Sequence, residues 1–422
     1  MIVTLPYGRA TVEVALPEGA TVAYPRVVAG VEHIAGEIRR AICEPVGCPP
    51  LREIARGKTG AVVVVNDVTR PAPSDVMLDL IAEELAAAGI GDDGIQVVVA
   101  TGNHRANTPE EIGAMLGAEA VRRFRVTNHD CARSQDMAFV GETANGFPVW
   151  VNRMVADAPV KVLTGLITPH HVAGYSGGRK SILPGVAGLE TIARHHSFPN
   201  RLYGPAMGIL DGNPFHELSV LAARLVGVDF IVNVVKNWRG QVVRAVAGDL
   251  EAAHHAGMAV CEDNWLLDLP HLFDVVIATP GGYPRDINLH QAQKAMSAAE
   301  QLVAPGGAIV LVAECGDGVG AFGSWLKSGS SPQAVIDRFM REGFTAEHSS
   351  KAFLCARALA EHPVVVVCGG IPAPELSAMF FLPATSAQDA VDRALSLAGP
   401  APRVLALPYA VDCVPRVAGE MG

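Results

Sequence analysis

The sequence has 422 residues, of which 50% are hydrophobic and 18% are charged, and its mean hydropathy is +0.27. This length and composition allow two or three domains with a large buried core and exclude a disordered chain. The net charge of -10 at pH 7, without a basic tract, argues against nucleic-acid binding, although local arginines could still hold an anionic small substrate.

The first residues contain no basic segment followed by an apolar core, and every apolar run is interrupted well before bilayer length. The eight cysteines are scattered and form no C-x-x-C pair, which is typical of reduced thiols and does not favour a cysteine-based zinc site. We therefore expect a cytoplasmic protein without a signal peptide, a transmembrane helix or a membrane partner.

A predicted β-hairpin opens the chain, with strands at 2–5 and 11–15 around a Tyr7-Gly8-Arg9 turn. Short, nearly continuous apolar runs then alternate with longer helical patterns, which predicts an α/β protein with mainly parallel sheets. The predicted strands are 61–66, 95–101, 161–165, 230–235, 275–279, 308–312, 363–368 and 403–407. The predicted helices are 74–88, 109–116, 214–225, 250–260, 291–300, 332–341, 351–361 and 387–397.

A domain boundary is predicted near Asp268-Leu269-Pro270, because residues 274–282 are typical of the first strand and loop of a new α/β unit. We therefore expect an N-terminal α/β domain over residues 1–269, a C-terminal α/β domain over residues 270–422, and an active-site cleft between them. The sequence leaves open whether the last strand, near residues 403–408, rejoins the N-terminal domain.

Polar clusters follow four of the predicted strands. In parallel sheets, ligands bind beyond the carboxyl ends of the strands, so these clusters predict one polar site. The residues that carry this expectation are Asp67, Thr69 and Arg70 after the first long strand, His104 after the next, His170 with a glycine-rich loop after the third, and the 281–291 stretch in the second domain.

The loop G-Y-S-G-G-R-K-S, residues 174–181, is similar to a nucleotide-binding P-loop but departs from it. A P-loop has glycine immediately before its lysine, and here Arg179 occupies that position. Hydrolysis of a nucleoside triphosphate is therefore disfavoured, while a single phosphate could be bound by Ser176, Gly177 and Gly178. Lys180 is a candidate phosphate clamp or, with a lowered pKa, a covalent nucleophile.

Further candidates come from single side chains, each of which also has a purely structural interpretation. His104 could shuttle protons, and Arg70 could bind a carboxylate bidentately, or both could belong to ordinary turns. His195-His196 could lie on a helix end or supply one metal ligand, and no set of three ligands accompanies the pair. Gln291 and Lys294 share a helix face. His254-His255 is interpreted as structural.

Taken together, these motifs resemble the nickel-dependent lactate racemase family of 2-hydroxyacid racemases and epimerases. The resemblance covers most of the chain and rests on D-V-T-R-P, G-N-H-R, H-x-x-A-G-Y-S-G-G-R-K-S-I-L-P-G, the following H-H, and N-L-H-Q-A-Q-K. It implies an isomerase whose N-terminal domain carries a nickel-pincer nucleotide, a pyridinium-3-thioamide-5-thiocarboxylic acid mononucleotide with nickel, covalently attached to Lys180. The proteins that synthesise this cofactor would then be partners.

The resemblance also implies roles for individual residues. His196 would complete the nickel coordination, with His195 as the fallback, and His104 and His170 would act as acid and base on opposite faces of the substrate. The carboxylate of the substrate would be held by Arg70 and Lys294 with help from Gln291, while Asp67 and Thr69 would orient the cofactor or the arginine. Ser176, Gly177 and Gly178 would contact the cofactor.

One departure concerns the substrate. His290 stands where the lactate racemase used for comparison has an aromatic residue, so the extra imidazole could bind a second polar group of a larger acid. Lactate, malate, aryl-lactates and sugar acids all remain candidates.

The expected reaction inverts Cα by reversible hydride transfer through a 2-oxo acid, because a Cα proton beside a carboxylate is too weakly acidic to be removed easily. Two other functions stay open. One is a phosphate-binding lyase or dehydrogenase in which Lys180 is a clamp or forms a Schiff base. The other is a non-catalytic cofactor-binding protein.

Overall fold

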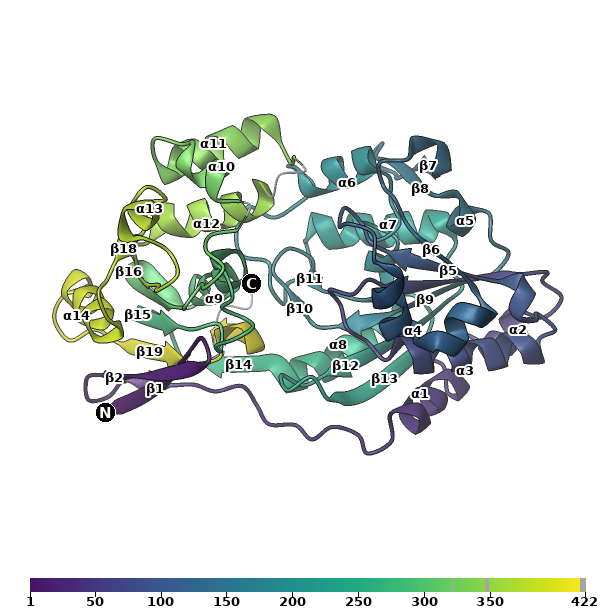
Figure 1. The fold of residues 1–422 in the computed structure, drawn as a ribbon, viewed down its shortest axis with the longest axis horizontal. Helices are drawn as coiled ribbons and strands as arrows, with labels where there is room; N and C mark the ends of the chain where they lie inside the picture. The colour runs from purple at the N-terminus through teal and green to yellow at the C-terminus, as the bar shows by residue number, and fades with distance from the viewer. Residues whose placement is uncertain (321, 346–348, 418–422) are drawn as a thin grey trace. The chain divides into compact units, whose positions relative to one another are not determined.

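The computed structural model describes residues 1–320, 322–345 and 349–417, which divide into two compact units (Figure 1). We call Val27–Leu202 with Gly208–Asn264 the central unit, and Met1–Arg26, Tyr203–Met207 and Trp265–Gly422 the terminal unit. Each is an α/β unit with mainly parallel strands, so the predicted fold class is confirmed. None of the helices in these described ranges combines the length and apolar character that a membrane crossing requires.

The central unit is built on a six-stranded sheet in the order β13-β12-β9-β4-β5-β6. All neighbours are parallel except β12 and β13, which pair antiparallel. Residues Val62 to Val65 have no exposed surface, which explains why this strand is an unbroken apolar run. The strands are β4 (Ala61–Asn66), β5 (Ile95–Ala100), β6 (Arg125–Asn128), β9 (Lys161–Ile167), β12 (Phe230–Lys236) and β13 (Val242–Gly248).

Helices and two small antiparallel pairs complete the central unit. Local sequence sets several helix ends: Thr108 and Glu111 form a capping box at the start of α4, and Gly227 ends α7 with a left-handed φ of 75°. The helices are α1 (Ile34–Cys43), α2 (Leu51–Ile54), α3 (Ser74–Ala87), α4 (Pro109–Arg123), α5 (Arg153–Ala156), α6 (Leu189–His196), α7 (Pro214–Val226) and α8 (Ala252–Trp265). The pairs are β7 (Met137–Glu142) with β8 (Pro148–Asn152), and β10 (Pro169–His170) with β11 (Gly174–Tyr175).

The terminal unit contains a second six-stranded sheet, entirely parallel, in the order β18-β17-β16-β15-β19-β3. Its strands are β3 (Thr21–Val22), β15 (Phe273–Ala278), β16 (Val303–Val312), β17 (Val364–Val367), β18 (Leu382–Pro383) and β19 (Val404–Leu407). A hairpin of β1 (Ile2–Tyr7) and β2 (Ala10–Ala15) and a parallel pair of β14 (Leu266–Leu269) and β20 (Val414–Val417) accompany it. The helices are α9 (Leu289–Ala299), α10 (Gly323–Lys327), α11 (Pro332–Glu342), α12 (Ser349–Glu361), α13 (Ala373–Ser377) and α14 (Ala387–Ala398).

The division of the chain differs from the predicted one at its start. Residues 1–26 belong to the terminal unit, where β3 pairs with β19, and Leu5 and Val14 lie in the same core cluster as β15, β16 and α14. These contacts join residues several hundred positions apart, which local patterns do not reveal. Strand β19 pairs with β15 inside the terminal unit, so the last predicted strand stays with the second half of the chain.

Candidate functional site

Most of the predicted central-unit residues line one small cavity at the carboxyl edge of the central sheet. The cavity has a volume of about 160 Å³ and lies where β4, β5 and β9 end. The lining includes Asp67, Arg70, His104, His170, Ser176, Gly177, Lys180 and His196. Three strand-end loops that are far apart in sequence, together with the end of α6, therefore deliver a carboxylate, three imidazoles, a guanidinium and an amine to the same space.

His104 is held by a buried carboxylate. Its Nδ1 lies 2.7 Å from Asp67 Oδ2, and the Thr69 hydroxyl donates to the other oxygen, Oδ1, also at 2.7 Å. Burial acts to raise the pKa of Asp67, but the hydrogen bonds from His104 and Thr69 outweigh it and lower that pKa below its usual value. An ionised Asp67 can only accept, so Nδ1 of His104 carries a hydrogen, and in a neutral ring Nε2 then has the lone pair of a general base.

His170 is held in the opposite tautomer. The backbone N–H groups of Val172 and Ala173 donate to its Nδ1, at 3.2 and 3.1 Å, so this nitrogen must carry the lone pair. In a neutral ring the hydrogen then lies on Nε2, which is 3.0 Å from Lys180 Nζ. This contact requires the Lys180 amine to accept, and a neutral amine can do so while an ammonium cannot.

Lys180 has the surroundings of a neutral amine. Desolvation by the surrounding protein lowers its pKa well below the usual value, and the positive charges of Arg70 and Arg179 add to this effect. The pKa and the hydrogen bond from His170 therefore lead to the same protonation state. A neutral lysine with a lone pair is nucleophilic, which is the state needed for acylation or Schiff-base formation.

The two neighbouring histidines of α6 have different environments. His195 is fully buried, stacks on Phe215 with ring centroids 3.6 Å apart, and is absent from the cavity lining. His196 lines the cavity, and its Nδ1 lies 2.9 Å from the Ile192 carbonyl, which can only accept. The lone pair of His196 is consequently on Nε2, and burial lowers the pKa of this histidine to about 3, so the ring is neutral. A neutral imidazole with an assigned lone pair is a suitable metal ligand.

The glycine-rich loop is held by side chains that sequence reasoning did not assign to the site. Gly177 has a φ of 81°, and a Cβ there would lie 2.5 Å from Asn233 Oδ1, so both its conformation and its surroundings favour glycine. The Gly178 N–H donates to the same Asn233 oxygen at 2.9 Å, and Gly178 does not line the cavity. The Ser176 hydroxyl donates to the Leu166 carbonyl at 2.7 Å. The Ser176 hydroxyl and the Gly178 N–H, two of the three predicted phosphate contacts, therefore already donate hydrogen bonds within the protein.

Arg179, which occupies the position of the missing P-loop glycine, points into the protein. It is 1% exposed, and its guanidinium donates to the carbonyls of Ser176, Gly177 and Ala173 and to His216 Nδ1. His254 Nε2 lies 2.8 Å from one guanidinium nitrogen. Burial lowers the pKa of Arg179 to about 9. Arg179 therefore holds the loop through its carbonyls, on the side buried in the protein. His254 contacts this guanidinium, which agrees with its structural interpretation.

The remaining predicted residues lie on α9 of the terminal unit. Asn288 caps this helix by accepting from the Gln291 N–H at 3.0 Å, and Lys294 Nζ donates to Gln291 Oε1 at 2.6 Å. The ring of His290 packs edge-on against Phe322, with centroids 5.8 Å apart. Gln291 and Lys294 share a helix face as predicted. That these side chains join the central-unit cavity in one cleft stays a prediction.

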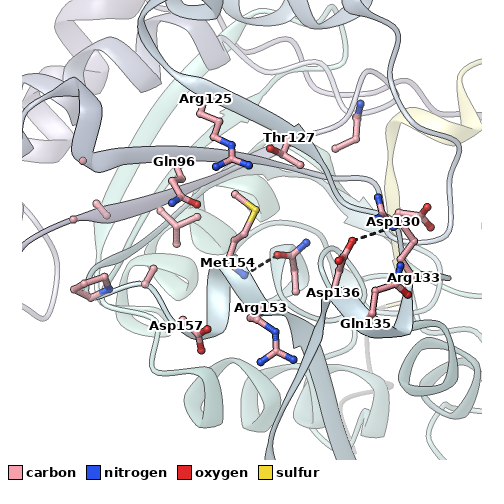
Figure 2. Close-up of a pocket in the computed structure, with 18 residues that line it drawn as sticks. Gln96, Arg125, Thr127, Asp130, Arg133, Gln135, Asp136, Arg153, Met154 and Asp157 are labelled. Atoms are coloured by element: carbon pink, nitrogen blue, oxygen red, sulfur yellow. Dashed lines mark hydrogen bonds and ion pairs between the residues drawn. The ribbon is translucent and has the colours of Figure 1, made fainter.

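A larger cavity, of about 610 Å³, lies at the opposite, amino-terminal edge of the central sheet and contains none of the predicted residues (Figure 2). Arg125 and Thr127 of β6 lie on one side of it and Arg153 and Asp157 on the other. Among the residues that the structure describes, no group of three or more His, Cys, Asp or Glu side chains is placed to hold a metal ion, at this cavity or elsewhere.

Comparison with known proteins identifies the family. The family model for the lactate racemase N-terminal domain matches residues 7–202, and the model for the lactate racemase C-terminal domain matches residues 270–414. The lactate racemase of Thermoanaerobacterium thermosaccharolyticum is 32% identical over 98% of this chain and 99% of the relative. The chain belongs to the lactate racemase family. The resemblance predicted from the motifs is thereby confirmed, and membership implies a cofactor-dependent isomerase.

Two further comparisons also match lactate racemases, and a third matches the fold alone. The lactate racemase of Lactiplantibacillus plantarum is 33% identical over 88% of both chains. The structure of the lactate racemase apoprotein from Thermoanaerobacterium thermosaccharolyticum superimposes with a TM-score of 0.88 at 30% identity, covering 99% of this chain and 100% of that one. A Thermotoga maritima protein shares the fold with a TM-score of 0.67 at 17% identity, covering 93% of this chain and 100% of that one.

Proposed function

We propose that this protein is a racemase or epimerase of short 2-hydroxy acids that inverts Cα by reversible hydride transfer, through a 2-oxo acid, using a nickel-pincer nucleotide attached to Lys180. The observation that carries the proposal is the pair of histidines with opposite tautomers. His104 offers a lone pair on Nε2 and His170 a hydrogen on Nε2, and both line the cavity that contains the neutral Lys180.

The residues of the cavity fit such a cofactor. Lys180 is a desolvated, neutral amine that could form the covalent link, and His196 could offer its Nε2 lone pair as one metal ligand. A single imidazole holds nickel only if the cofactor provides the other ligands, which is what a pincer does. When bound, the cofactor would supply the metal and the hydride acceptor that protein side chains lack. Proteins that synthesise and deliver it are the partners that we expect.

The chain's own residues would handle the proton and the carboxylate. His104, oriented by Asp67, would accept the hydroxyl proton on one face of the substrate, and His170, in its imidazolium form, would return a proton on the other face. One turnover would then leave His104 protonated and His170 neutral, which is the starting arrangement for the opposite enantiomer. Arg70 lines the cavity as a cation for the substrate carboxylate, and Asp67 and Thr69 keep His104 oriented.

The proposed substrate class follows from the relatives and from α9. Lactate is the substrate named for the relatives, and lactate, malate, aryl-lactates and sugar acids belong to the panel that should be tested. We propose that Lys294 and Gln291 hold the carboxylate together with Arg70, and that His290 contacts a second polar group of an acid larger than lactate. Substrates with a β- or γ-oxygen should then have a lower KM than lactate.

The deciding experiment measures intact mass and nickel content after exposure of the protein to the pincer cofactor. The unmodified sequence should gain a covalent adduct and about one nickel per chain, since one lysine and one histidine are available. Lys180→Ala should gain neither. Lys161→Ala is the matched control, because Lys161 starts β9 at the other edge of the sheet and donates to the Ala158 carbonyl.

Three results would reject the proposal. The first is an absence of adduct and nickel under loading conditions that work for an authentic lactate racemase. The second is trapping of Lys180 by borohydride in the presence of an oxo substrate, which would favour a Schiff-base lyase instead. Retained nickel with no turnover on any acid of the panel would favour a non-catalytic cofactor-binding protein.

A further inference from the structure

Two cysteines meet at the carboxyl edge of the terminal sheet. Cys315 follows β16 and Cys368 follows β17, and these strands are parallel neighbours with Val312 opposite Val367. The Gly370 N–H donates to the Glu314 carbonyl at 2.8 Å, and the Cys368 thiol lies 3.5 Å from the same carbonyl oxygen. The loop after β17 is therefore held to the loop after β16 at the residue that precedes Cys315.

The two thiols interact with each other and are chemically unequal. The Cys315 thiol donates a hydrogen bond to the Cys368 sulfur, which lowers the pKa of Cys368 and raises that of Cys315. The backbone N–H groups of Gly370 and Ile371 lower the pKa of Cys368 further, against the opposing effects of burial and of the Asp286 carboxylate. Cys315 is buried and Cys368 is partly exposed. An accessible thiol with thiolate character beside a buried partner is typical of a redox-sensitive pair.

The backbone around the pair is constrained. Cys315 has a left-handed φ of 52°, and a Cβ at Gly370 would lie 1.9 Å from the Cys315 carbonyl oxygen, so the two loops approach closely at this point. The N–H of Gly369, the residue after Cys368, donates to the Tyr7 hydroxyl at 2.8 Å, which ties this loop to the end of β1. Main-chain contacts therefore hold the two cysteine-bearing loops close together.

We propose that Cys315 and Cys368 form a peroxide-sensitive thiol pair that is oxidised reversibly to an intramolecular disulfide. The Cys368 thiolate attacks hydrogen peroxide, breaks its O–O bond and takes one oxygen as a sulfenic acid, and the other oxygen leaves as water after protonation. The Cys315 thiol then attacks the sulfenic sulfur, an S–S bond forms, and a second water leaves. Peroxide is reduced, the two thiols are oxidised, and a small-molecule thiol restores them.

Oxidation would reach the predicted substrate residues through main-chain hydrogen bonds. The Cys315 N–H donates to the Asp286 carbonyl at 2.9 Å, and the Asp317 N–H to the Ile287 carbonyl at 2.8 Å. The N–H groups of Leu289 and His290 donate back to the carbonyls of Gly318 and Val319. A crosslink at Cys315 therefore fixes the loop that holds the start of α9. This consequence, a changed KM for the substrate, rests on the proposed function, whereas disulfide formation does not.

The test compares full-length protein before and after brief exposure to hydrogen peroxide. Oxidation should make the chain two hydrogen atoms lighter and reduce the eight alkylatable thiols by two, and peptide mapping should join Cys315 to Cys368. Cys368→Ser and Cys315→Ser should both lose the crosslink, and Cys315→Ser should accumulate a sulfenic acid on Cys368 that dimedone traps. Cys43→Ser, which removes an exposed thiol elsewhere, should still form the disulfide.

The outcomes separate the two parts of the proposal. Unchanged mass, a disulfide between other cysteines, or equal dimedone labelling of Cys43 and Cys368 would overturn the thiol pair. A Cys315–Cys368 disulfide with an unchanged KM in cofactor-loaded enzyme would overturn only the link to substrate binding. Loss of turnover in every variant, reduced or oxidised, would instead count against the proposed function and leave the mass result intact.

Discussion

The two edges of the central sheet carry cavities of opposite character. At the carboxyl edge, a cavity of about 160 Å³ contains ionisable groups that burial and neighbours hold in unusual states: a neutral lysine, a neutral histidine and an ionised, buried aspartate. At the amino edge, a cavity of about 610 Å³ is lined by arginines and aspartates, of which Arg133 and Asp136 form a surface ion pair (Figure 2). The larger cavity is therefore not the better candidate for the active site, because the groups with shifted pKa values line the smaller one.

The first prediction concerns His104 and His170, the two histidines proposed to transfer protons in the carboxyl-edge cavity. With the cofactor loaded, His104→Gln and His170→Gln should each lower kcat by about 10²- to 10⁴-fold, because each ring transfers a proton in one direction. Nickel content should stay unchanged. Racemisation measured from both enantiomers, with nickel analysis alongside, checks this result.

The contradicting outcome is specific for each variant. Loss of nickel in His104→Gln would assign that ring to the metal, and full activity of either variant would remove it from proton transfer. A hydroxyl proton exchanges with water even without an enzyme, so isotope exchange at this position does not report on catalysis. Chiral analysis of the acid is therefore the appropriate readout.

A second prediction concerns the support of the glycine-rich loop. Arg179→Met should destabilise the protein by about 3 kcal/mol, because three loop carbonyls and the His216 imidazole lose their donor inside the protein. Denaturant unfolding of the cofactor-free protein measures this change in the free energy of unfolding.

Arg224→Met is the matched control. Arg224 lies on α7 and forms an exposed ion pair with Glu251, so its loss should change the free energy of unfolding by about 0.5 kcal/mol or less. Equal effects in the two variants would mean that the buried guanidinium contributes no more to the free energy of unfolding than a surface one. In that case, relief of its desolvation cost would offset the loss of its hydrogen bonds.

A third prediction concerns Asp67 and has a pH dependence of known sign. Asp67→Asn should lower kcat about 10- to 100-fold, because His104 loses the carboxylate that fixes its tautomer. The pKa of Asp67 in the folded protein lies below its ordinary value of 3.8, so its ionisation stabilises the fold above about that pH. This contribution is lost as the pH falls through the folded pKa.

Unfolding curves at neutral pH and near pH 3 check the stability part. The difference between the unmodified protein and Asp67→Asn should be present at neutral pH and should shrink in acid. A difference that grows in acid would show that Asp67 is protonated in the folded protein, and the assigned tautomer of His104 would then be wrong.

Much of this carboxyl-edge arrangement could be predicted from the sequence, because polar residues interrupt apolar strands abruptly at Asp67, His104 and His170. The choice between His195 and His196 could not, since adjacent helix residues point about 100° apart and only the packing shows which one reaches the cavity. The sequence shows that Arg179 occupies the position of the P-loop glycine, but not that the fold turns its side chain inward. The placement of residues 1–26 depends on the pairing of β3 with β19 and on packing of the hairpin in the core of the terminal unit, which no local pattern encodes.

The smallest expected effect lies at the amino edge. Arg133 and Asp136 form an ion pair of 3.1 Å there, with about half of each side chain exposed, at 58% and 45%. A double-mutant cycle of Arg133→Ala and Asp136→Ala should give a coupling free energy of about 0.2–1 kcal/mol that falls as salt is added, and racemisation should not change. A coupling that resists salt, or a loss of turnover in cofactor-loaded enzyme, would mean that the larger cavity takes part in function, because solvent screens a surface pair but not a group held in a site.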